Sequence, residues 1–334
     1  MKIDFVVTWL DSSDPEWIKL YNQYRPGIHK EDKGRYRNWD FFRYWFRAVE
    51  NFAPWVNNVF LITNGKTPEW INPDCPKLKL IKHSDYIPDK YLPTFNSRTI
   101  EFNMNRINDL SEHFVYFNDD CFVNGDISPE YYFRDGLPND FNNETIFNGM
   151  RYTPQARFGT NISIACDIGV INYHFNRRDV IRGNLRKWYG SHLGVSGFLT
   201  SLLLYNRSRF EGFKSNHNEQ AYLKSIFDEV WQKEYNMVDK TCTRFREDAT
   251  LNPYFFRFWQ LATNRFNPIK YRRCVFQLGV SNVAEICSSL ENETIKSICL
   301  NDGPLCEYED YLRVKEIIGN VFEKKFPQKS SFEI

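Results

Sequence analysis

Short apolar runs of strand length alternate with helical stretches over residues 1–117, and this order limits the fold more than any other feature of the chain. The apolar runs lie at residues 3–9, 59–63, 78–81 and 114–117, and the helical stretches at 39–52 and 95–107. A further helix is expected from Asp14-Pro15, where a capping residue precedes a proline. Strands that alternate with helices pack as a mostly parallel sheet. The sequence therefore predicts an α/β fold of nucleotide-binding type.

The pattern after residue 120 is less regular. A strand is expected around residues 162–171, and helices are expected to begin at residues 216–219, which resemble a capping box, and near Asn252-Pro253. The chain has neither a G-x-G-x-x-G nor a Walker motif, so dinucleotide and P-loop hypotheses lack their phosphate-binding loop. No repeat or linker divides the chain. We therefore predict one domain in which the sheet carries a helical elaboration.

Composition narrows the class of protein. A chain of 334 residues with a net charge of +1 does not suggest a nucleic-acid-binding surface. Aromatic residues make up 17%, which suits a thick core and equally suits sugar binding. The eight cysteines form no CxxC pair and lie mostly in apolar runs, as reduced thiols do. With no leader pattern and no apolar run of membrane-spanning length, we predict a cytoplasmic protein, without excluding attachment to a membrane-bound complex.

Two adjacent carboxylates follow the apolar run at 114–117, in the sequence Asn118-Asp119-Asp120. A solvated turn explains such a sequence in many proteins. However, open α/β sheets bind ligands at the carboxyl ends of their parallel strands. Carboxylates at that edge commonly hold a divalent metal ion against a phosphorylated substrate.

Three other polar clusters stand at predicted strand ends or helix starts. The first runs from Thr8 through Trp9 and Asp11 to Asp14, in a loop whose backbone amides can hold phosphate while a carboxylate contacts a ribose or base. The second contains Asn96, Ser97, Arg98 and Glu101, which suit an anion or sugar hydroxyls. Turn formation and helix capping remain open as explanations of both clusters.

The third cluster pairs His217 with Arg246 and Asp248. The positive end of a helix dipole disfavours imidazolium, so a neutral His217 in the first turn of a helix would be available as a general base. A purely structural role of this single histidine stays open. Arg246 can clamp a phosphate, or it can pair with Asp248 on the surface. Together the clusters indicate a site that moves phosphorylated groups.

Read in order, these segments resemble the Stealth family of sugar-phosphate transferases. The resemblance rests on five stretches. The first is residues 3–17 (IDFVVTWLDSSDPEW), and the second is residues 36–126, which contain Asn64-Gly65, LPTFNS at 92–97 and YFNDD at 116–120. The third pairs SNHNE at 215–219 with FDEVW at 227–231, the fourth pairs RFR at 244–246 with NPY at 252–254, and the fifth is the tail FPQKSSFE at 326–333. Ser12 departs from the family, which usually has glycine there, and a loop that required positive φ would strain this serine.

The resemblance implies transfer of a sugar-1-phosphate from a nucleotide sugar, typically UDP-linked, to a sugar hydroxyl, with release of UMP. It implies a GT-A or Rossmann-like sheet that binds the nucleotide sugar. It assigns His217 as the base, Arg246 to the transferring phosphate, and Asp119 with Asp120 to Mg²⁺ or Mn²⁺. The implied donor-binding residues are Thr8, Trp9, Asp11, Asn64, Arg98 and Glu101.

The implied organisation is a single catalytic domain over residues 1–334. It comprises a nucleotide-sugar-binding core at 1–126, a variable acceptor-side region at 127–210, and a helical catalytic part with the tail at 211–334. The implied partners are a nucleotide-sugar donor and an oligosaccharide or polysaccharide acceptor, with peripheral association with a membrane capsule-export complex. No nucleic-acid partner is expected.

Two alternatives remain open on the sequence. A metal-dependent glycosyltransferase of similar fold would release UDP in place of UMP. A catalytically silent carbohydrate-binding protein would use the aromatic side chains alone and release no nucleotide. The ordered polar clusters favour an enzyme, because a lectin needs no phosphate site.

Overall fold

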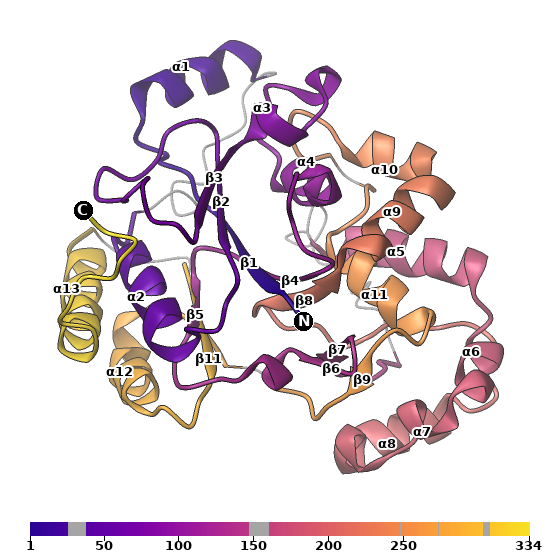
Figure 1. Ribbon diagram of the computed structural model, residues 1–334. Coiled ribbons are helices and arrows are strands. Elements are labelled where there is room, and N and C mark those ends of the chain that lie inside the picture. Colours follow the sequence, from indigo (N-terminus) through magenta and orange to yellow (C-terminus); the bar gives the residue numbers. More distant parts are fainter. Residues whose placement is uncertain (26–37, 147–159, 248, 273, 303–307) are drawn as a thin grey trace.

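The computed structural model describes residues 1–25, 38–146, 160–247, 249–272, 274–302 and 308–334. Its centre is a five-stranded sheet in the order β3-β2-β1-β4-β8 (Figure 1). The strands are β1 (Ile3–Thr8), β2 (Val59–Thr63), β3 (Leu78–Lys82), β4 (His113–Phe117) and β8 (Gln220–Leu223). The first four are parallel, and β8 pairs antiparallel with β4. The predicted α/β fold with a mostly parallel sheet is confirmed, including β3 at an edge.

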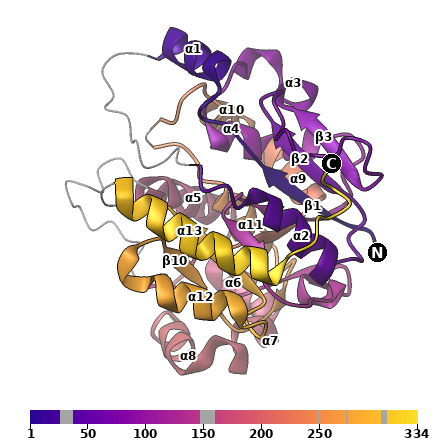
Figure 2. The same ribbon diagram turned by 90° about the vertical axis from the view of Figure 1, so that its left-hand side faces the viewer.

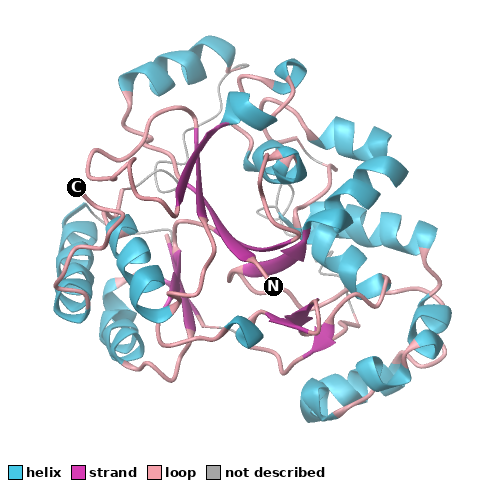
Figure 3. Ribbon diagram, in the orientation of Figure 1, coloured by secondary structure: helices cyan, strands magenta, loops and turns pink. Residues whose placement is uncertain are grey.

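Burial explains why these strands read as continuous apolar runs. Phe5, Val6 and Val7 of β1 are fully buried because helices and loops cover both faces of the sheet. Helices α5, α9, α10 and α11 lie on one side of the central sheet, and α2, α12 and α13 lie on the other (labelled in Figure 1). Figure 3 shows in the same view how helices, in cyan, flank the strands, in magenta. Because β1, β2, β3 and β4 are parallel, their carboxyl ends lie at the same edge of the sheet.

Two small sheets and a set of short helices complete the fold. The small sheets are β10 (Val275–Gln277), β11 (Ser297–Asn301) and β5 (Cys121–Val123), and β6 (Phe133–Arg134), β7 (Leu137–Asp140) and β9 (Asn267–Pro268). The α-helices are α1 (Pro15–Tyr24), α2 (Phe42–Phe52), α3 (His83–Tyr86), α4 (Ser97–Phe102), α5 (Thr160–His174), α6 (Arg177–Gly183), α7 (Leu185–Trp188), α8 (Gly194–Leu203), α9 (Lys224–Lys233), α10 (Tyr235–Thr241), α11 (Tyr254–Ala262), α12 (Val283–Glu291) and α13 (Tyr308–Lys325). In the described part of the chain, no helix combines the length and the apolar character that a membrane span requires.

Three predicted elements differ from the structure. Residues 162–171 lie within helix α5, not in a strand; their apolar side chains pack against the helical layer, and Asp167 accepts a hydrogen bond from the backbone of Asn252 (2.8 Å). Residues 216–219 open no helix, because the chain continues as strand β8, which uses the free edge of β4. The helix predicted at 95–107 is interrupted at Asn103, whose side chain donates to the carbonyl of Thr99 (2.8 Å).

The remaining predicted elements are present. Helix α1 begins at Pro15 as expected, although the Asp14 carboxylate binds Lys66 (3.2 Å) and does not cap the helix. The helix predicted at 39–52 is α2, and the one predicted near Asn252-Pro253 is α11. The seven described cysteines are free thiols, as expected, and Cys306 lies outside the described residues.

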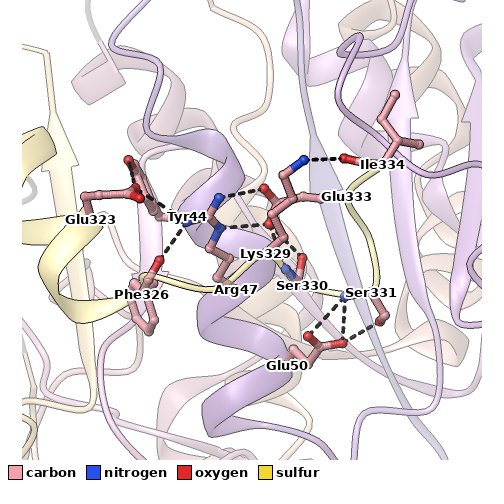
Figure 4. Close-up of polar contacts among 10 residues, drawn as sticks. All are labelled: Tyr44, Arg47, Glu50, Glu323, Phe326, Lys329, Ser330, Ser331, Glu333 and Ile334. Atoms are coloured by element: carbon pink, nitrogen blue, oxygen red, sulfur yellow. Dashed lines mark hydrogen bonds and ion pairs between the residues drawn. The ribbon is translucent and has the colours of Figure 1, made fainter.

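The C-terminal tail is held on α2 by a buried ion pair (Figure 4). Arg47 donates from Nε and Nη2 to the two carboxylate oxygens of Glu333, both at 2.8 Å, and from Nη1 to the carbonyl of Phe326 (2.6 Å). Burial raises the pKa of Glu333, but the bonds from Arg47 and Ser330 outweigh it and hold that pKa below its ordinary value. The tail therefore closes the fold beside the N-terminal half of the chain (Figure 2).

Replacing Glu333 by alanine should lower the free energy of unfolding by about 3–5 kcal/mol, because Arg47 would be left buried without its charge partner. Chemical denaturation at neutral pH measures this change. The matched control is Glu323→Ala, which removes a second carboxylate near Arg47 (3.5 Å) that is 58% exposed. The control should cost less than about 1 kcal/mol. Equal losses in the two variants would contradict the assignment.

Candidate active site

A cavity of about 620 Å³ opens at the carboxyl edge of the parallel strands. Its wall collects side chains from distant parts of the chain. They include Thr8, Trp9, Asp11, Trp17, Trp39, Phe95, Ser97, Tyr116, Asn118, Asp119, Asp120, His217, Arg246 and Asp302. One cavity therefore brings together seven of the residues predicted from the sequence: Thr8, Trp9, Asp11, Asp119, Asp120, His217 and Arg246.

The ends of β1 and β4 are joined through Tyr116. Its hydroxyl lies 3.1 Å from the hydroxyl of Thr8 and donates to the side-chain oxygen of Asn118 (3.0 Å). Asp11, in the next turn, accepts from the backbone N–H of Ser13 (2.9 Å) and pairs with Lys66 (3.4 Å). Burial raises the pKa of Asp11, but the hydrogen bond from the Ser13 hydroxyl (2.6 Å), followed by the Ser13 backbone and Lys66, outweighs it and holds that pKa below its ordinary value.

The Ser12 loop shows no strain of the kind that glycine relieves. Among the described residues, the non-glycine positions with positive φ are Asp40, Asp109, Asp135, Ala249 and Asn264, and Ser12 is not one of them. The loop therefore accepts serine where the family usually has glycine.

Asp119 and Asp120 place two carboxylates side by side at the cavity wall, where Asp119 is exposed and Asp120 is partly buried. The protein atoms that surround the Asp119 carboxylate, and next the charge of Asp120, raise the pKa of Asp119 to about 7. Burial also acts to raise the pKa of Asp120, but the neighbouring His217 outweighs it and the net pKa is lowered. Two carboxylates that cannot both be ionised without a counter-charge provide a suitable site for a divalent cation.

His217 lies in the loop before β8, not in the first turn of a helix. Its Nε2 is 3.6 Å from Oδ2 of Asp120, and the interaction with this carboxylate raises the pKa of His217. The expectation that a helix dipole keeps His217 neutral is therefore wrong, because the chain here extends into a strand and a carboxylate faces the imidazole. Asp120 nevertheless faces the ring at the cavity wall.

Arg246 also lines the cavity. Its guanidinium donates to the hydroxyl of Ser97, at the start of α4. Glu101, one turn further along α4, does not line the cavity, but its charge acts on both Arg246 and His217. Burial raises the pKa of Glu101 to about 7. The predicted alternative partner of Arg246, Asp248, lies outside the described residues.

Two further candidates lie away from the cavity wall. Arg98 is buried, and its Nη1 donates to the hydroxyl of Thr250 (2.6 Å) and to the carbonyl of Glu247 (3.2 Å). Asn64 accepts from the backbone N–H of Lys66 (3.3 Å) in the turn after β2. Arg98 thus holds the loop that follows Arg246, and Asn64 holds the turn whose Lys66 pairs with Asp11.

The donor atoms at the strand end favour a hard cation. Asp120, Cys121 and Cys299 bring three ligand atoms within 4.8 Å of one another. However, the pKa of each thiol is raised. For Cys121 the hydrogen bond with Cys299 and then burial raise the pKa. For Cys299 the hydrogen bond with Cys121 lowers the pKa, but burial and the charge of Asp120 outweigh that effect and raise the pKa to about 11. The protonated thiols donate, as Cys121 does to Asp120 (3.3 Å), so the carboxylates are the groups that fit Mg²⁺ or Mn²⁺.

Two parts of the cavity wall were not found from the sequence. Residues 300–302 span the end of strand β11, and their Leu-Asn-Asp pattern repeats the signal of a polar strand end that drew attention to Asn118. Residues 38–41 precede α2, Phe42 begins it, and the segment contains Asp40 with φ of 58°. Nothing local in that segment indicates a cavity.

A second cavity of about 760 Å³ lies beyond the loop that carries His217. Asn216, Asn218 and Glu219 line it, together with Tyr131 and Arg272, whose guanidinium lies 4.9 Å above the Tyr131 ring. Burial raises the pKa of Glu219 to about 7. The loop at 216–219 thus separates two cavities.

The paired carboxylates, imidazole and guanidinium define a site suited to phosphoryl-group transfer. Residues 35–140 match the family description "Stealth protein CR2, conserved region 2". Over 99% of its length the chain is 38% identical to the capsular polysaccharide phosphotransferase WcwK of Streptococcus pneumoniae, covering 98% of that protein. It is 33% identical to the exopolysaccharide phosphotransferase cps2G of Lactiplantibacillus plantarum, with 99% and 96% covered.

The chain belongs to the Stealth family of sugar-phosphate transferases. A solved structure of the galactosyltransferase LgtC aligns over 95% of both chains at 10% identity, with a TM-score of 0.37. This score is too low to support an argument about the chain.

The pKa of Glu101 makes a testable contribution to pH-dependent stability. The pKa of Glu101 rises from 4.5 to about 7 on folding, so between these two pH values the folded protein keeps a proton that the unfolded chain loses. The free energy of unfolding should therefore decrease as the pH rises from 4.5 to about 7. In Glu101→Gln this decrease should be smaller. Denaturant titrations of the metal-free protein across the window measure it. An unchanged slope in the variant would contradict the prediction.

Proposed function

We propose that this enzyme transfers a sugar-1-phosphate from a nucleotide sugar to a sugar hydroxyl, in the synthesis of a capsular or other surface polysaccharide. The donor is UDP-linked, for example a UDP-N-acetylhexosamine, and UMP leaves. The observation that carries the proposal is the meeting of Asp119, Asp120, His217 and Arg246 in one cavity. Membership of the Stealth family supports the same reaction class.

In the proposed reaction, the acceptor oxygen attacks the phosphorus that bears the sugar. A new P–O bond forms to the acceptor, the bond between the two phosphates breaks, and the bridging oxygen leaves with UMP. His217 takes the proton of the acceptor hydroxyl, and Asp120 orients its imidazole. Because the pKa of His217 is raised, a higher pH than for an ordinary histidine is needed to produce the neutral imidazole that accepts the proton. Arg246, positioned by Ser97, stabilises the charge that develops on the transferring phosphate.

The donor would lie along the β1 loop. Thr8, Trp9 and Asp11 line this part of the cavity, and Trp9 offers an apolar ring. Asn64, Arg98 and Glu101 would act from behind the wall by holding the loops and by their charge. Asp119 and Asp120 would hold Mg²⁺ or Mn²⁺, which when bound neutralises negative charge on phosphate oxygens.

We place the acceptor on the side of the second cavity. Its wall draws Tyr131 and Phe141 from the acceptor-side region 127–210, and shares the 216–219 loop with the donor cavity. Arg272 and Lys296 in this wall suit an acceptor chain that carries phosphodiesters. Both cavities draw on residues throughout the chain, which supports treating 1–334 as a single catalytic domain. Its free thiols fit a cytoplasmic location, with peripheral association with a membrane capsule-export complex.

The identity of the released nucleotide tests the reaction. Incubation with a panel of nucleotide sugars and oligosaccharide primers, with Mg²⁺ present, should release UMP and yield an acceptor bearing a phosphodiester. A glycosyltransferase would break the sugar–oxygen bond and release UDP instead. UDP as the sole nucleotide product would sink the proposal, and a carbohydrate-binding protein would release no nucleotide.

Removing the base should reduce turnover without unfolding the protein. We expect His217→Ala to lower kcat by about 10²–10⁴-fold, the usual contribution of general acid–base catalysis. Steady-state kinetics with a saturating donor measure kcat, and thermal unfolding shows whether the variant is folded. The matched control, His113→Ala, removes a histidine at the other end of β4, where it contacts the carbonyl of Gly136 (3.0 Å). A kcat for His217→Ala equal to that of the control would exclude His217 as the base.

A further inference from the structure

Helix α8 presents its apolar side chains to solvent. Val195, Leu199 and Leu203 are 81%, 55% and 73% exposed, and they recur every four residues along one side of the helix. Phe198 and Leu202, 41% and 47% exposed, extend the same side. These five side chains are called the α8 face below. Monomeric proteins rarely expose a contiguous apolar surface of this kind without using it.

The opposite side of α8 is small and packed. Gly197 and Ser201 are its buried residues. A Cβ atom at Gly197 would lie 2.3 Å from Nδ2 of Asn143, and that amide nitrogen donates to the carbonyl of Leu193 (2.9 Å). Only a side without bulky groups fits here, so packing holds the apolar side outward.

The helix stands at the periphery of the molecule. In Figures 1 and 2 it lies at the lower edge in both views, with α6 and α7 leading to it and well away from the central sheet. Leu185 on α7 and Tyr205 after α8 are also exposed, at 55% and 64%. Exposed apolar side chains are therefore also present on the segments that flank α8.

Positive charge gathers around this surface. Residues 177–210 carry seven basic side chains and one acidic one, whereas the whole chain has a net charge of only +1. The exposed basic residues of the segment are Arg178, Arg182, Arg186, Arg207 and Arg209. The single acidic residue of the segment, Asp179, is 4.0 Å from Arg182, and Glu211, just after the segment, is 3.8 Å from Arg207, so the other three exposed arginines carry the excess charge.

We propose that α8 inserts its apolar face into the interface of an anionic phospholipid membrane while the surrounding arginines contact the lipid phosphates. A ten-residue helix is too short to span a bilayer, but an exposed apolar face beside arginines fits a helix lying in the headgroup region. Basic residues next to such a helix gain affinity from anionic lipid. This surface is separate from the proposed catalytic cavity, and its function does not depend on the reaction assigned there.

Charge argues against a second copy of the chain as the occupant. A two-fold contact through α8 is self-complementary, so each arginine-rich segment would meet its own equivalent. Like charges facing each other oppose such a dimer. An anionic membrane instead complements both the apolar and the basic parts of the surface.

The test is sedimentation of the full chain with vesicles of phosphatidylglycerol and phosphatidylcholine in equal parts, against vesicles of phosphatidylcholine alone. The wild type should bind the anionic vesicles more tightly, and added salt should weaken the binding. Leu199→Glu/Leu203→Glu should reduce binding by about tenfold or more, and Arg207→Gln/Arg209→Gln should reduce it by less. The control Leu312→Glu changes a leucine of α13 that is 45% exposed and should bind as the wild type does.

Because the changed side chains are exposed, each variant should remain folded. Thermal unfolding checks this. The proposal is overturned if the folded wild type does not bind anionic vesicles, or if Leu199→Glu/Leu203→Glu binds them equally well. It is also overturned if sedimentation velocity shows a wild-type dimer that this variant dissociates, because the α8 face would then be covered by a second copy.

Discussion

The antiparallel pairing of β8 with β4 is the contact on which the site depends. Tyr116 lies opposite Gln220 in this pairing, so the chain before β8 runs past the carboxyl end of β4. His217 is thereby brought to Asp120, although the two are separated by nearly a hundred residues of sequence. The same strand closes the edge of the parallel sheet, which would otherwise leave the backbone groups of β4 unpaired. One ladder of hydrogen bonds thus completes the sheet and assembles the candidate chemistry.

Long-range contacts also shape the cavity from the C-terminal side. The hydroxyl of Tyr311 and the amino group of Lys315, both on α13, donate to the carbonyl of Asn38 (2.6 and 3.1 Å). Asn38 belongs to the segment that lines the cavity just before α2. The tail that follows α13 is anchored on α2 by Arg47. The far end of the chain therefore holds the position of a wall formed by its beginning.

Much of the site was visible in the sequence because polar residues at the ends of apolar runs keep their meaning in a parallel sheet. Thr8 lies at the end of a predicted strand, Asp11 and Asp119 follow predicted strands, and all three reach the cavity. Arg98 carries the same kind of signal, yet its guanidinium is used to hold the loop at 247–250. Residue type and position along an element do not reveal which way a side chain turns. That direction depends on the groups that pack around it.

The sequence alone determined the class of fold, since the alternation of apolar runs and helices over residues 1–117 leaves few arrangements other than a mostly parallel sheet. It also determined the family, through polar motifs that recur in a set order. Tertiary structure decided that residues 220–223 form a strand and that a carboxylate faces His217. It decided equally that α8 shows its apolar side to solvent. In each case the outcome rests on a partner distant in the sequence, Val115, Asp120 or Asn143, whose contact outweighs the local pattern.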